Sequence, residues 1–444
     1  MQVDVGKVID DAKLNRLHYL ILGVGLFVLI VDAYDLVSMG IVIPRLAEEW
    51  GIDRAEFGIA LSISMVGVLI GSGASGLLGD YIGRKKTMIL TVAIAGVFMG
   101  LTITAETINE LLFYRFMTGL GAGGCIPITI AHASEFMPER ARNRLVVLMY
   151  TGAGMGSVFA GFAGPTLMAN YGWQGIFGAG AIISMSALGM LILLLPESVK
   201  FLLATGADKD SITGIVKKVD ADFDPDPNDE YIIVEEVDEV TGNPLKELFT
   251  NSRAGITLLA WGVMLGNQFL LFALALWMPT LLTQAGLTES LSLTVLALYN
   301  LGGVFGGWAF SVFADKFDPG RVLTVTYPLA GIAIIALGAS LETTPGLITA
   351  AITAGFFSIG SSFCLGPYVA SLYPTRARST GIGWALSIGR IGSILSPLVA
   401  GWAIGAGYET STILYAAAVP PVVCGLLVIW LRRLAFQSAE TATA

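Results

Sequence analysis

Residues 17–44 read LHYLILGVGLFVLIVDAYDLVSMGIVIP, an apolar run that carries two carboxylates, Asp32 and Asp35, near its middle. A helix needs about 20 apolar residues to cross a bilayer, so the run is long enough to span one. An ionised carboxylate at the bilayer centre costs on the order of 2.5–3.5 kcal/mol on insertion scales. Side chains three residues apart point to the same side of a helix. The stretch therefore predicts a membrane-spanning helix whose two carboxylates face an aqueous cavity or a buried cation.

The composition extends this interpretation to the whole chain. Of 444 residues, 55% are hydrophobic and 13% are charged, whereas soluble domains are usually about a quarter charged. The 54 glycines fit the close approach of membrane helices. The three cysteines lie in apolar runs without metal-ligand spacing, which indicates buried thiols. We therefore expect a polytopic membrane protein with no metal and no cofactor.

Twelve apolar spans, each near or above the length a helix needs to cross, alternate with polar segments. They cover residues 17–44, 55–79, 86–105, 109–136, 143–169, 173–195, 254–284, 290–314, 321–341, 345–372, 379–405 and 409–431. This pattern predicts an N-terminal six-helix bundle at 17–195 and a C-terminal one at 254–433. An N-terminal segment at 1–16, an acidic linker at 196–253 and a tail at 434–444 complete the chain.

The basic residues predict the orientation of the spans. If the N-terminus lies inside, only Arg45 and Arg54 fall on the outer side, and the other basic residues between spans collect inside. Lys and Arg concentrate on the cytoplasmic side of membrane proteins. We therefore expect a multi-pass protein of the cell inner (plasma) membrane whose two termini and central linker are cytoplasmic.

The chain repeats itself at an offset of about 235 residues. The matched residues are Pro44 with Pro279, Gly51 with Gly286, Gly67 and Gly71 with Gly302 and Gly306, Asp80 with Asp315, and, one residue later in register, Gly156 with Gly392. Parallel repeats of this kind place a substrate site near the midplane between them. The predicted fold is thus an all-α membrane fold of twelve transmembrane helices in two parallel six-helix repeats.

The repeat also contains one informative difference. Asp32 falls on Asn267 and Asp35 falls on Leu270, so the second half keeps amides, Asn267 and Gln268, where the first keeps carboxylates. Two interpretations stay open. The amides either hydrogen-bond the substrate while the carboxylates handle protons, or they only form bonds between helices.

Residues 76–86, between the second and third spans, read GLLGDYIGRKK. They resemble the G-x-L-x-D-x-x-G-R-[RK] signature of the major facilitator superfamily. A second copy, ADKFDPGR at 314–321, keeps the Asp and the Gly-Arg pair but inserts two residues. The resemblance implies the fold of that superfamily and alternating access. It also implies gating roles for four residues, namely Asp80, Arg84, Asp315 and Arg321.

Within that superfamily the chain resembles the aromatic acid:proton symporter family. The resemblance rests on DAYD at 32–35, where the family typically reads D-G-x-D, on RFMTGLGAGG at 115–124, on WMPT at 277–280, on YPTR at 373–376 and on Gly389-Arg390. Ala33 departs from the usual Gly, but it lies off the face that the two aspartates share. The resemblance implies proton-driven uptake of a benzoate-type anion. The functional positions that carry over are Asp32, Asp35, Arg115, Arg390, Asp80 and Arg84.

Four charges stand out inside the spans: Asp32, Asp35, Arg115 and Arg390. Their formal sum is zero, which a membrane cavity tolerates. A proton on one aspartate would make the sum positive and admit an organic anion, which is a symport mechanism. Arginine suits a carboxylate ligand because its planar fork donates two parallel hydrogen bonds. The alternative for Arg115 is an ion pair that fixes the fourth span on the first, and for Arg390 an interhelical bond or a gate contact.

Further polar residues inside the spans are also candidates. His132 and Glu135 lie three residues apart near the inner end of 109–136, where they form either a proton relay or hydrogen bonds of an inner gate. Tyr299 either offers a stacking surface for an aromatic substrate or, as is more common for a single aromatic residue, packs between helices or faces lipid. Asn300 is a buried amide that needs a partner, so we assign both to the substrate site.

The sequence contains no G-x-x-x-x-G-K-[ST] loop, catalytic triad or metal cluster, which argues against an ATP-driven pump and against an enzyme. The expected partners are a small organic anion, protons and membrane lipid, without nucleic acid, and we expect a monomer. Two alternatives remain. The chain could carry or export another organic acid, such as a sugar acid or a nicotinate-like compound, or it could be a sensor that binds ligand without transporting it.

Overall fold

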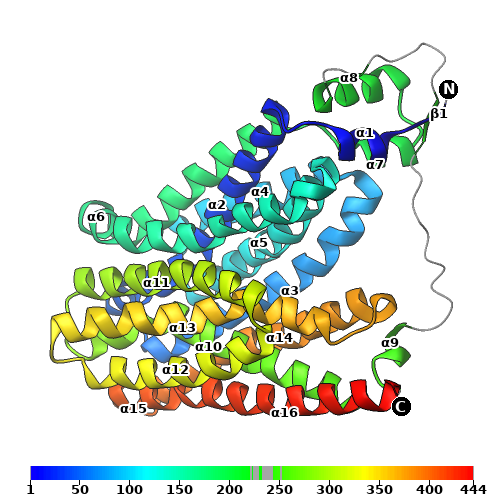
Figure 1. Ribbon diagram of the computed structural model, residues 1–444. Coiled ribbons are helices and arrows are strands. Elements are labelled where there is room, and N and C mark those ends of the chain that lie inside the picture. Colours follow the sequence, from blue (N-terminus) through cyan, green and yellow to red (C-terminus); the bar gives the residue numbers. More distant parts are fainter. Residues whose placement is uncertain (1, 221–222, 224–229, 233–243, 251–252, 444) are drawn as a thin grey trace. The chain divides into compact units, whose positions relative to one another are not determined.

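The computed structural model describes residues 2–220, 223, 230–232, 244–250 and 253–443, and these are almost entirely helical (Figure 1). Before the linker, the helices are α1 (Val5–Asp11), α2 (Arg16–Trp50), η1 (Arg54–Glu56), α3 (Phe57–Ile82), α4 (Arg84–Leu101), η2 (Thr102–Thr104), α5 (Ile108–Phe136) and α6 (Glu139–Leu194). The linker holds α7 (Val199–Ala204), α8 (Lys209–Val219) and α9 (Pro244–Glu247). After it come α10 (Ala254–Gln284), α11 (Glu289–Lys316), α12 (Pro319–Ala339), α13 (Thr344–Ser371), α14 (Thr375–Gly405), α15 (Thr410–Ala417) and α16 (Val419–Thr443).

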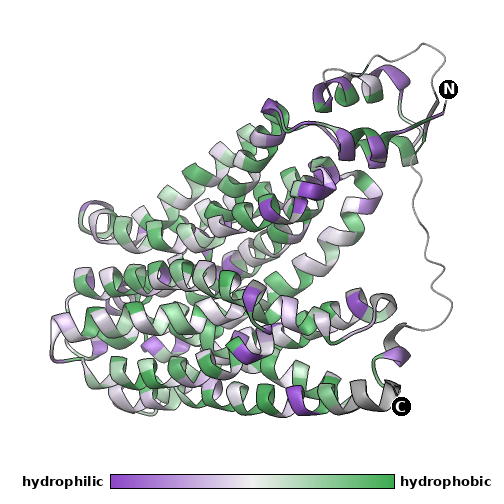
Figure 2. Ribbon diagram, in the orientation of Figure 1, coloured by the Kyte–Doolittle hydropathy of each residue, from purple (hydrophilic) through white to green (hydrophobic). Residues whose placement is uncertain are grey.

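Among the described residues, eleven helical segments are long and apolar enough to cross a membrane, and hydrophobic residues dominate them (Figure 2). One of the eleven is α6, which has 56 residues and contains Gly172 at φ 65°, ψ −166°. This non-helical residue divides α6 into two membrane-length helices. The twelve predicted spans and the all-α membrane fold are therefore confirmed.

Local sequence explains where the helices begin and end. The side chain of Thr107 accepts a hydrogen bond from the backbone N–H of Glu110 at the start of α5, which satisfies one of the free donors of the first turn. Gly51 follows α2 at φ 65°, and Gly286 follows α10 at φ 88°. Only glycine adopts this left-handed conformation without strain. The two glycines are partners in the sequence repeat, so both halves end their first helix in the same way.

The repeat is also present in the packing of the helices. A Cβ atom on Gly71 of α3 would collide with the carbonyl oxygen of Leu120 in α5, and one on Gly306 of α11 would collide with that of Phe356 in α13. Gly71 and Gly306 are 235 residues apart, and Leu120 and Phe356 are 236 apart. The same backbone-to-backbone approach therefore recurs at the predicted offset.

The chain forms two compact units. Unit 1 comprises Met1–Asp35, Val66–Gly156 and Phe177–Asp238, and unit 2 comprises Leu36–Met65, Ser157–Ile176 and Glu239–Ala444. Several long helices contribute to both units. The division into bundles at 17–195 and 254–433 stays a prediction.

Unit 1 contains a small element that the sequence did not indicate. Strand β1 (Gln2–Asp4) pairs in parallel with β2 (Glu230–Ile232) of the linker. Helix α1 contacts α8, and apolar side chains of both helices are buried in one cluster. Asp10 of α1 accepts hydrogen bonds from the backbone N–H of Glu139 and from Arg142, at the start of α6. The N-terminal segment is thus part of one folded element with α8 and β2 of the linker, and this element is anchored to α6.

Candidate functional site

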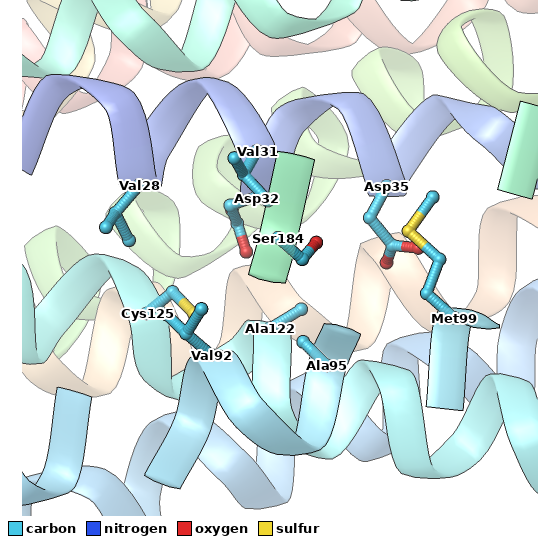
Figure 3. A pocket seen from close by; sticks show the side chains of 10 residues that line it. All are labelled: Val28, Val31, Asp32, Asp35, Val92, Ala95, Met99, Ala122, Cys125 and Ser184. Carbon is cyan, nitrogen blue, oxygen red and sulfur yellow. The ribbon is translucent and has the colours of Figure 1, made fainter. Parts of the chain in front are cut away.

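Asp32 and Asp35 lie in the middle of α2 and line a cavity inside unit 1. The side chains of Met99 from α4, Cys125 from α5 and Ser184 from α6 line the same cavity. Figure 3 shows both carboxyl groups pointing away from α2 and into this space. The predicted common face of the two carboxylates therefore meets a cavity between four helices.

The cavity is narrow and mostly apolar. Half of the ten residues that line it are aliphatic, namely Val28, Val31, Val92, Ala95 and Ala122. It has room for about one water molecule, which is far less than an aromatic ring needs. The space around the two carboxylates thus suits a water or a proton, and the ring of an aromatic ligand has to be held by other residues.

Arg115 of α5 pairs with one of the two carboxylates. Its Nη2 donates a hydrogen bond of 2.9 Å to Oδ1 of Asp35, and the two side chains are only 1% and 7% exposed. The guanidinium also lies 5.4 Å from the ring centre of Phe177, within the range of a cation–π contact. Removing one partner of a buried ion pair typically costs about 3–5 kcal/mol, because the other charge stays buried alone. The pair therefore ties α5 to α2, as the ion-pair interpretation of Arg115 proposed.

Glycines of α5 allow the helices around this site to approach closely. A Cβ on Gly121 would lie 2.5 Å from the backbone nitrogen of Ala95 in α4, and one on Gly123 would collide with the carbonyl of Val68 in α3. The sequence GLGAGG at 119–124 is thus explained by packing. It brings α3 and α4 onto α5 at the level of the cavity.

A second charge cluster lies at the junction of α3 and α4. Arg84 contacts Asp80 through Nη1 and donates a hydrogen bond of 3.0 Å from Nε to Oε1 of Glu135. Gly83, at φ 104°, precedes α4 and lies close to Glu197, whose carboxylate accepts the backbone N–H of Lys85. The structure therefore brings together three predicted gating residues, Asp80, Arg84 and Glu135, and adds Glu197.

His132 lies three residues before Glu135 on α5 and is 0% exposed. Its Nε2 is 2.9 Å from the carbonyl oxygen of Pro196, just beyond α6. This bond fixes the ring at the end of α6. In the described part of the chain, no group of three or more His, Cys, Asp or Glu is placed to hold a metal ion.

In unit 2, Asn267 of α10 is 2% exposed and lies within a hydrogen-bond network. Its Oδ1 accepts hydrogen bonds of 3.1 Å from Tyr327 of α12 and 3.1 Å from Ser362 of α13. These contacts link three helices. They favour the interpretation of Asn267 as an interhelical contact.

Gln268 of α10 packs against the residue that precedes Arg390 on α14, and both helices belong to unit 2. A Cβ on Gly389 of α14 would lie 3.1 Å from Cγ of Gln268 in α10, and Arg390 follows directly. Both side chains are only partly buried. Among the predicted substrate residues of unit 2, Gln268 and Arg390 are therefore the two whose side chains are partly accessible to solvent.

Tyr299 and Asn300 of α11 are both buried, and the structure gives each a partner. The hydroxyl of Tyr299 lies 3.0 Å from Oγ of Ser358 in α13, and Nδ2 of Asn300 donates to the carbonyl of Leu296. Tyr299 thus belongs to the α11–α13 interface. The Asn300 bond stays within its own helix.

The second copy of the signature differs from the first. The side chain of Asp315 lies outside the described part of the structure, and that of Arg321 is exposed. The charge pair found there is Asp318 with Arg432, at 3.1 Å, and Asp318 also caps α12 through the N–H groups of Gly320 and Arg321. Sequence reasoning missed Asp318, although an Asp directly before Pro-Gly at a helix start is a recognisable capping pattern.

The predicted residues thus gather in two places in unit 1 and are spread over α10, α11 and α14 in unit 2. Asp32, Asp35 and Arg115 form the first group, and the Arg84 cluster the second. A bundle of membrane-length helices with a buried ion pair beside a water-sized cavity is the architecture expected of a secondary transporter.

Comparison with known proteins agrees with this class. The profile of the Major Facilitator Superfamily matches residues 25–397. The chain is 30% identical to the gallate transporter of Pseudomonas putida over 428 residues, covering 96% of this chain and 94% of that protein. It is also 30% identical to a benzoate transport protein of Acinetobacter baylyi over 435 residues, or 97% and 92%. A D-xylose-proton symporter structure superposes with a TM-score of 0.70 at 14% identity, over 92% of this chain and 97% of that one, which shows a shared fold.

The chain therefore belongs to the aromatic acid transporter family of the major facilitator superfamily. It is accordingly a multi-pass membrane transporter and not an enzyme.

Proposed function

We propose that the protein takes up an aromatic carboxylate of the benzoate or hydroxybenzoate type together with protons, by alternating access. Relatives named for gallate and benzoate transport support the substrate class. We place the protein in the inner membrane as a monomer with both termini in the cytoplasm. The bundles 17–195 and 254–433 are the two halves that alternate.

The observation that carries the proposal is the buried Asp35–Arg115 pair beside Asp32 and a water-sized cavity. With both carboxylates ionised, these three groups carry a formal charge of −1. An organic anion adds a further negative charge and is therefore disfavoured until at least one proton has bound. Charge balance alone thus couples the two ligands.

A proton on Asp35 has a more specific consequence than neutralisation. It removes the acceptor charge that holds Arg115 at 2.9 Å, so the guanidinium becomes available to a second carboxylate. When the proton leaves, Asp35 competes for Arg115 again and the substrate is released. Asp32, three residues away on the same face, is the site through which the proton reaches or leaves the pair.

The aromatic ring requires residues outside the cavity. Gln268 and Arg390 are the best candidates in unit 2, because both are partly accessible and lie at neighbouring positions of packed helices. Asn300 is a further candidate to contact the substrate, through the oxygen of its side-chain amide. Tyr299 acts instead by packing against α13. We assign gating to the Arg84 cluster, with Asp80 and Glu135, and to the equivalent region at Asp315 and Arg321.

The proposal is tested in liposomes that contain the purified protein and receive radiolabelled benzoate, 4-hydroxybenzoate, gluconate or nicotinate outside. An inward proton gradient should drive accumulation of the two benzoates above equilibrium, and a protonophore should abolish it. Accumulation of gluconate alone would move the protein to another substrate class. Binding without any flux would identify a sensor, and accumulation only under an outward gradient would identify an exporter.

A further inference from the structure

A row of polar side chains on α5 connects the two charge groups of unit 1. Cys125 lines the cavity beside Asp32, and Glu135 contacts Arg84 at the other end. Thr129 and His132 lie between them. These residues follow at spacings of three or four, so they occupy successive turns along one side of the helix. At about 1.5 Å per residue, the row spans roughly 15 Å.

Three atoms in this row are buried and have no hydrogen-bond partner among the described residues. They are Oγ1 of Thr129, Nδ1 of His132 and Oε2 of Glu135. Buried polar atoms are almost always hydrogen-bonded, either to protein or to ordered water. Bound water along α5 would satisfy all three atoms, which lie on successive turns of one helix.

Thr129 lies on the side of α5 that faces α2, the helix that carries Asp32 and Asp35. A Cβ on Gly25 of α2 would lie 3.1 Å from Cγ2 of Thr129. Asp32 lies two helical turns beyond Gly25 on α2 and thus on nearly the same face. The row therefore begins at the α2–α5 interface on which Asp32 lies.

The hydrogen bond of His132 determines which of its ring nitrogens accepts a proton. A carbonyl oxygen only accepts, so Nε2 of His132 carries the hydrogen that it donates to Pro196. In the neutral ring, Nδ1 then carries a lone pair, and Nδ1 is the buried atom without a partner. His132 is thus held in the tautomer whose Nδ1 accepts a proton.

Charged groups reach His132 from three elements. Glu135 lies on α5 itself, Lys85 on α4, and Glu197 beyond the end of α6. Glu135 uses Oε1 to accept from Arg84, and its buried Oε2 is the carboxylate oxygen that remains to accept a further hydrogen bond. The two carboxylates stabilise an imidazolium that forms transiently, whereas the burial of the ring and the ammonium group of Lys85 oppose it.

We propose that this row is the proton path between the coupling carboxylates and the Arg84 cluster, with His132 as its relay. The proposal rests on the proton coupling proposed above. A proton leaves the carboxyl group of Asp32 and passes through water bonded to Thr129 to Nδ1 of His132, leaving Asp32 as a carboxylate. The imidazolium then gives this same proton from Nδ1, through water, to Oε2 of Glu135 and returns to its neutral form. The ring keeps its bond to Pro196 throughout and needs no rotation.

The test measures proton movement and substrate movement separately in liposomes that hold the full-length protein. A trapped pH dye reports proton entry driven by external benzoate, and radiolabelled benzoate reports exchange at equal pH on both sides. His132→Gln should slow proton entry about tenfold or more while exchange stays within about twofold of the wild type. Thr129→Val should slow proton entry less than His132→Gln does. Thr129→Ser, which keeps the hydroxyl, should keep proton entry near the wild-type rate. His18→Gln is the matched control, because His18 is the other histidine of the chain and is also buried, but on α2.

The outcomes separate the relay from a structural role and from the proposed function. Equal loss of proton entry and exchange in His132→Gln, with Thr129→Val like the wild type, would identify a gate residue and overturn the relay. Unchanged proton entry in both variants would overturn it as well. If His132→Gln yields no active protein, the comparison of Thr129→Val with Thr129→Ser decides. Benzoate transport by the wild type without any proton entry would instead overturn the coupling proposal and the relay with it.

Discussion

The buried pair of Asp35 and Arg115 makes a quantitative prediction about stability. Replacing Arg115 by Met removes the charge and keeps a side chain of similar length, which leaves the Asp35 carboxylate buried without the cation at 2.9 Å. Because both side chains are nearly inaccessible, the loss should be about 3–5 kcal/mol in the free energy of unfolding. The lost contact with Phe177 should add about 0.5–2 kcal/mol.

The double variant distinguishes an ion pair from ordinary packing. Asp35→Asn alone removes the charge that pairs with Arg115 at 2.9 Å, whereas Arg115→Met with Asp35→Asn removes both charges of the pair. The double variant should therefore be more stable than the sum of the two single losses predicts, by several kcal/mol. Arg45→Met is the control, because the Arg45–Glu48 pair is 58% and 73% exposed and should contribute less than about 1 kcal/mol.

The assay is unfolding by a denaturing detergent, in mixed micelles, followed by far-UV circular dichroism for the wild type and each variant. A loss below about 1 kcal/mol for Arg115→Met would refute the reasoning, since an exposed pair already contributes that much. Strict additivity of the two single variants would refute it independently, because it would show that the two side chains do not interact as charges.

Two further predictions concern packing and the second half. Gly71→Ala should abolish stable folding because its Cβ meets the carbonyl of Leu120, and the loss should be seen as loss of the monodisperse peak in size-exclusion chromatography. Gly73→Ala is the control and should fold normally, because no atom lies within 4 Å of its Cβ. Similar behaviour of the two variants would contradict the predicted close approach. Tyr327→Phe should cost about 0.5–1.5 kcal/mol of stability through the lost bond to Asn267 and leave the benzoate dissociation constant unchanged. A tenfold weaker affinity measured by calorimetry would instead place this network in the substrate site.

Sequence alone predicted the spans well because length and hydropathy decide them. Residues 254–284 were predicted as one span, and α10 has these bounds. The repeat was predictable because glycines at Gly71 and Gly306 are needed for the same backbone contact in both halves. The sequence also separated the fifth and sixth spans at 170–172, and the non-helical Gly172 lies there.

Long-range pairings were beyond the sequence. The pairing of Gln2 with Glu230 joins segments 228 residues apart, and neither three-residue strand has a pattern of its own. The spacing of Asp32 and Asp35 predicted a common face, but it did not indicate which carboxylate Arg115 contacts. The repeat identified Asn267 and Gln268 as the amides at the level of the two aspartates. It did not indicate the partners of Asn267 on α12 and α13, because these depend on tertiary packing.

The most direct test of the account is the ratio of protons to benzoate moved by the wild type and by Asp35→Asn. Both are reconstituted in liposomes, where a trapped pH dye and radiolabelled benzoate are followed together. The wild type should move at least one proton with each benzoate and accumulate benzoate under an inward proton gradient. Asp35→Asn should lose both the proton movement and the accumulation but still exchange internal for external benzoate. Gradient-driven accumulation by Asp35→Asn at the wild-type level would contradict the central claim that protonation of Asp35 controls the anion site through Arg115.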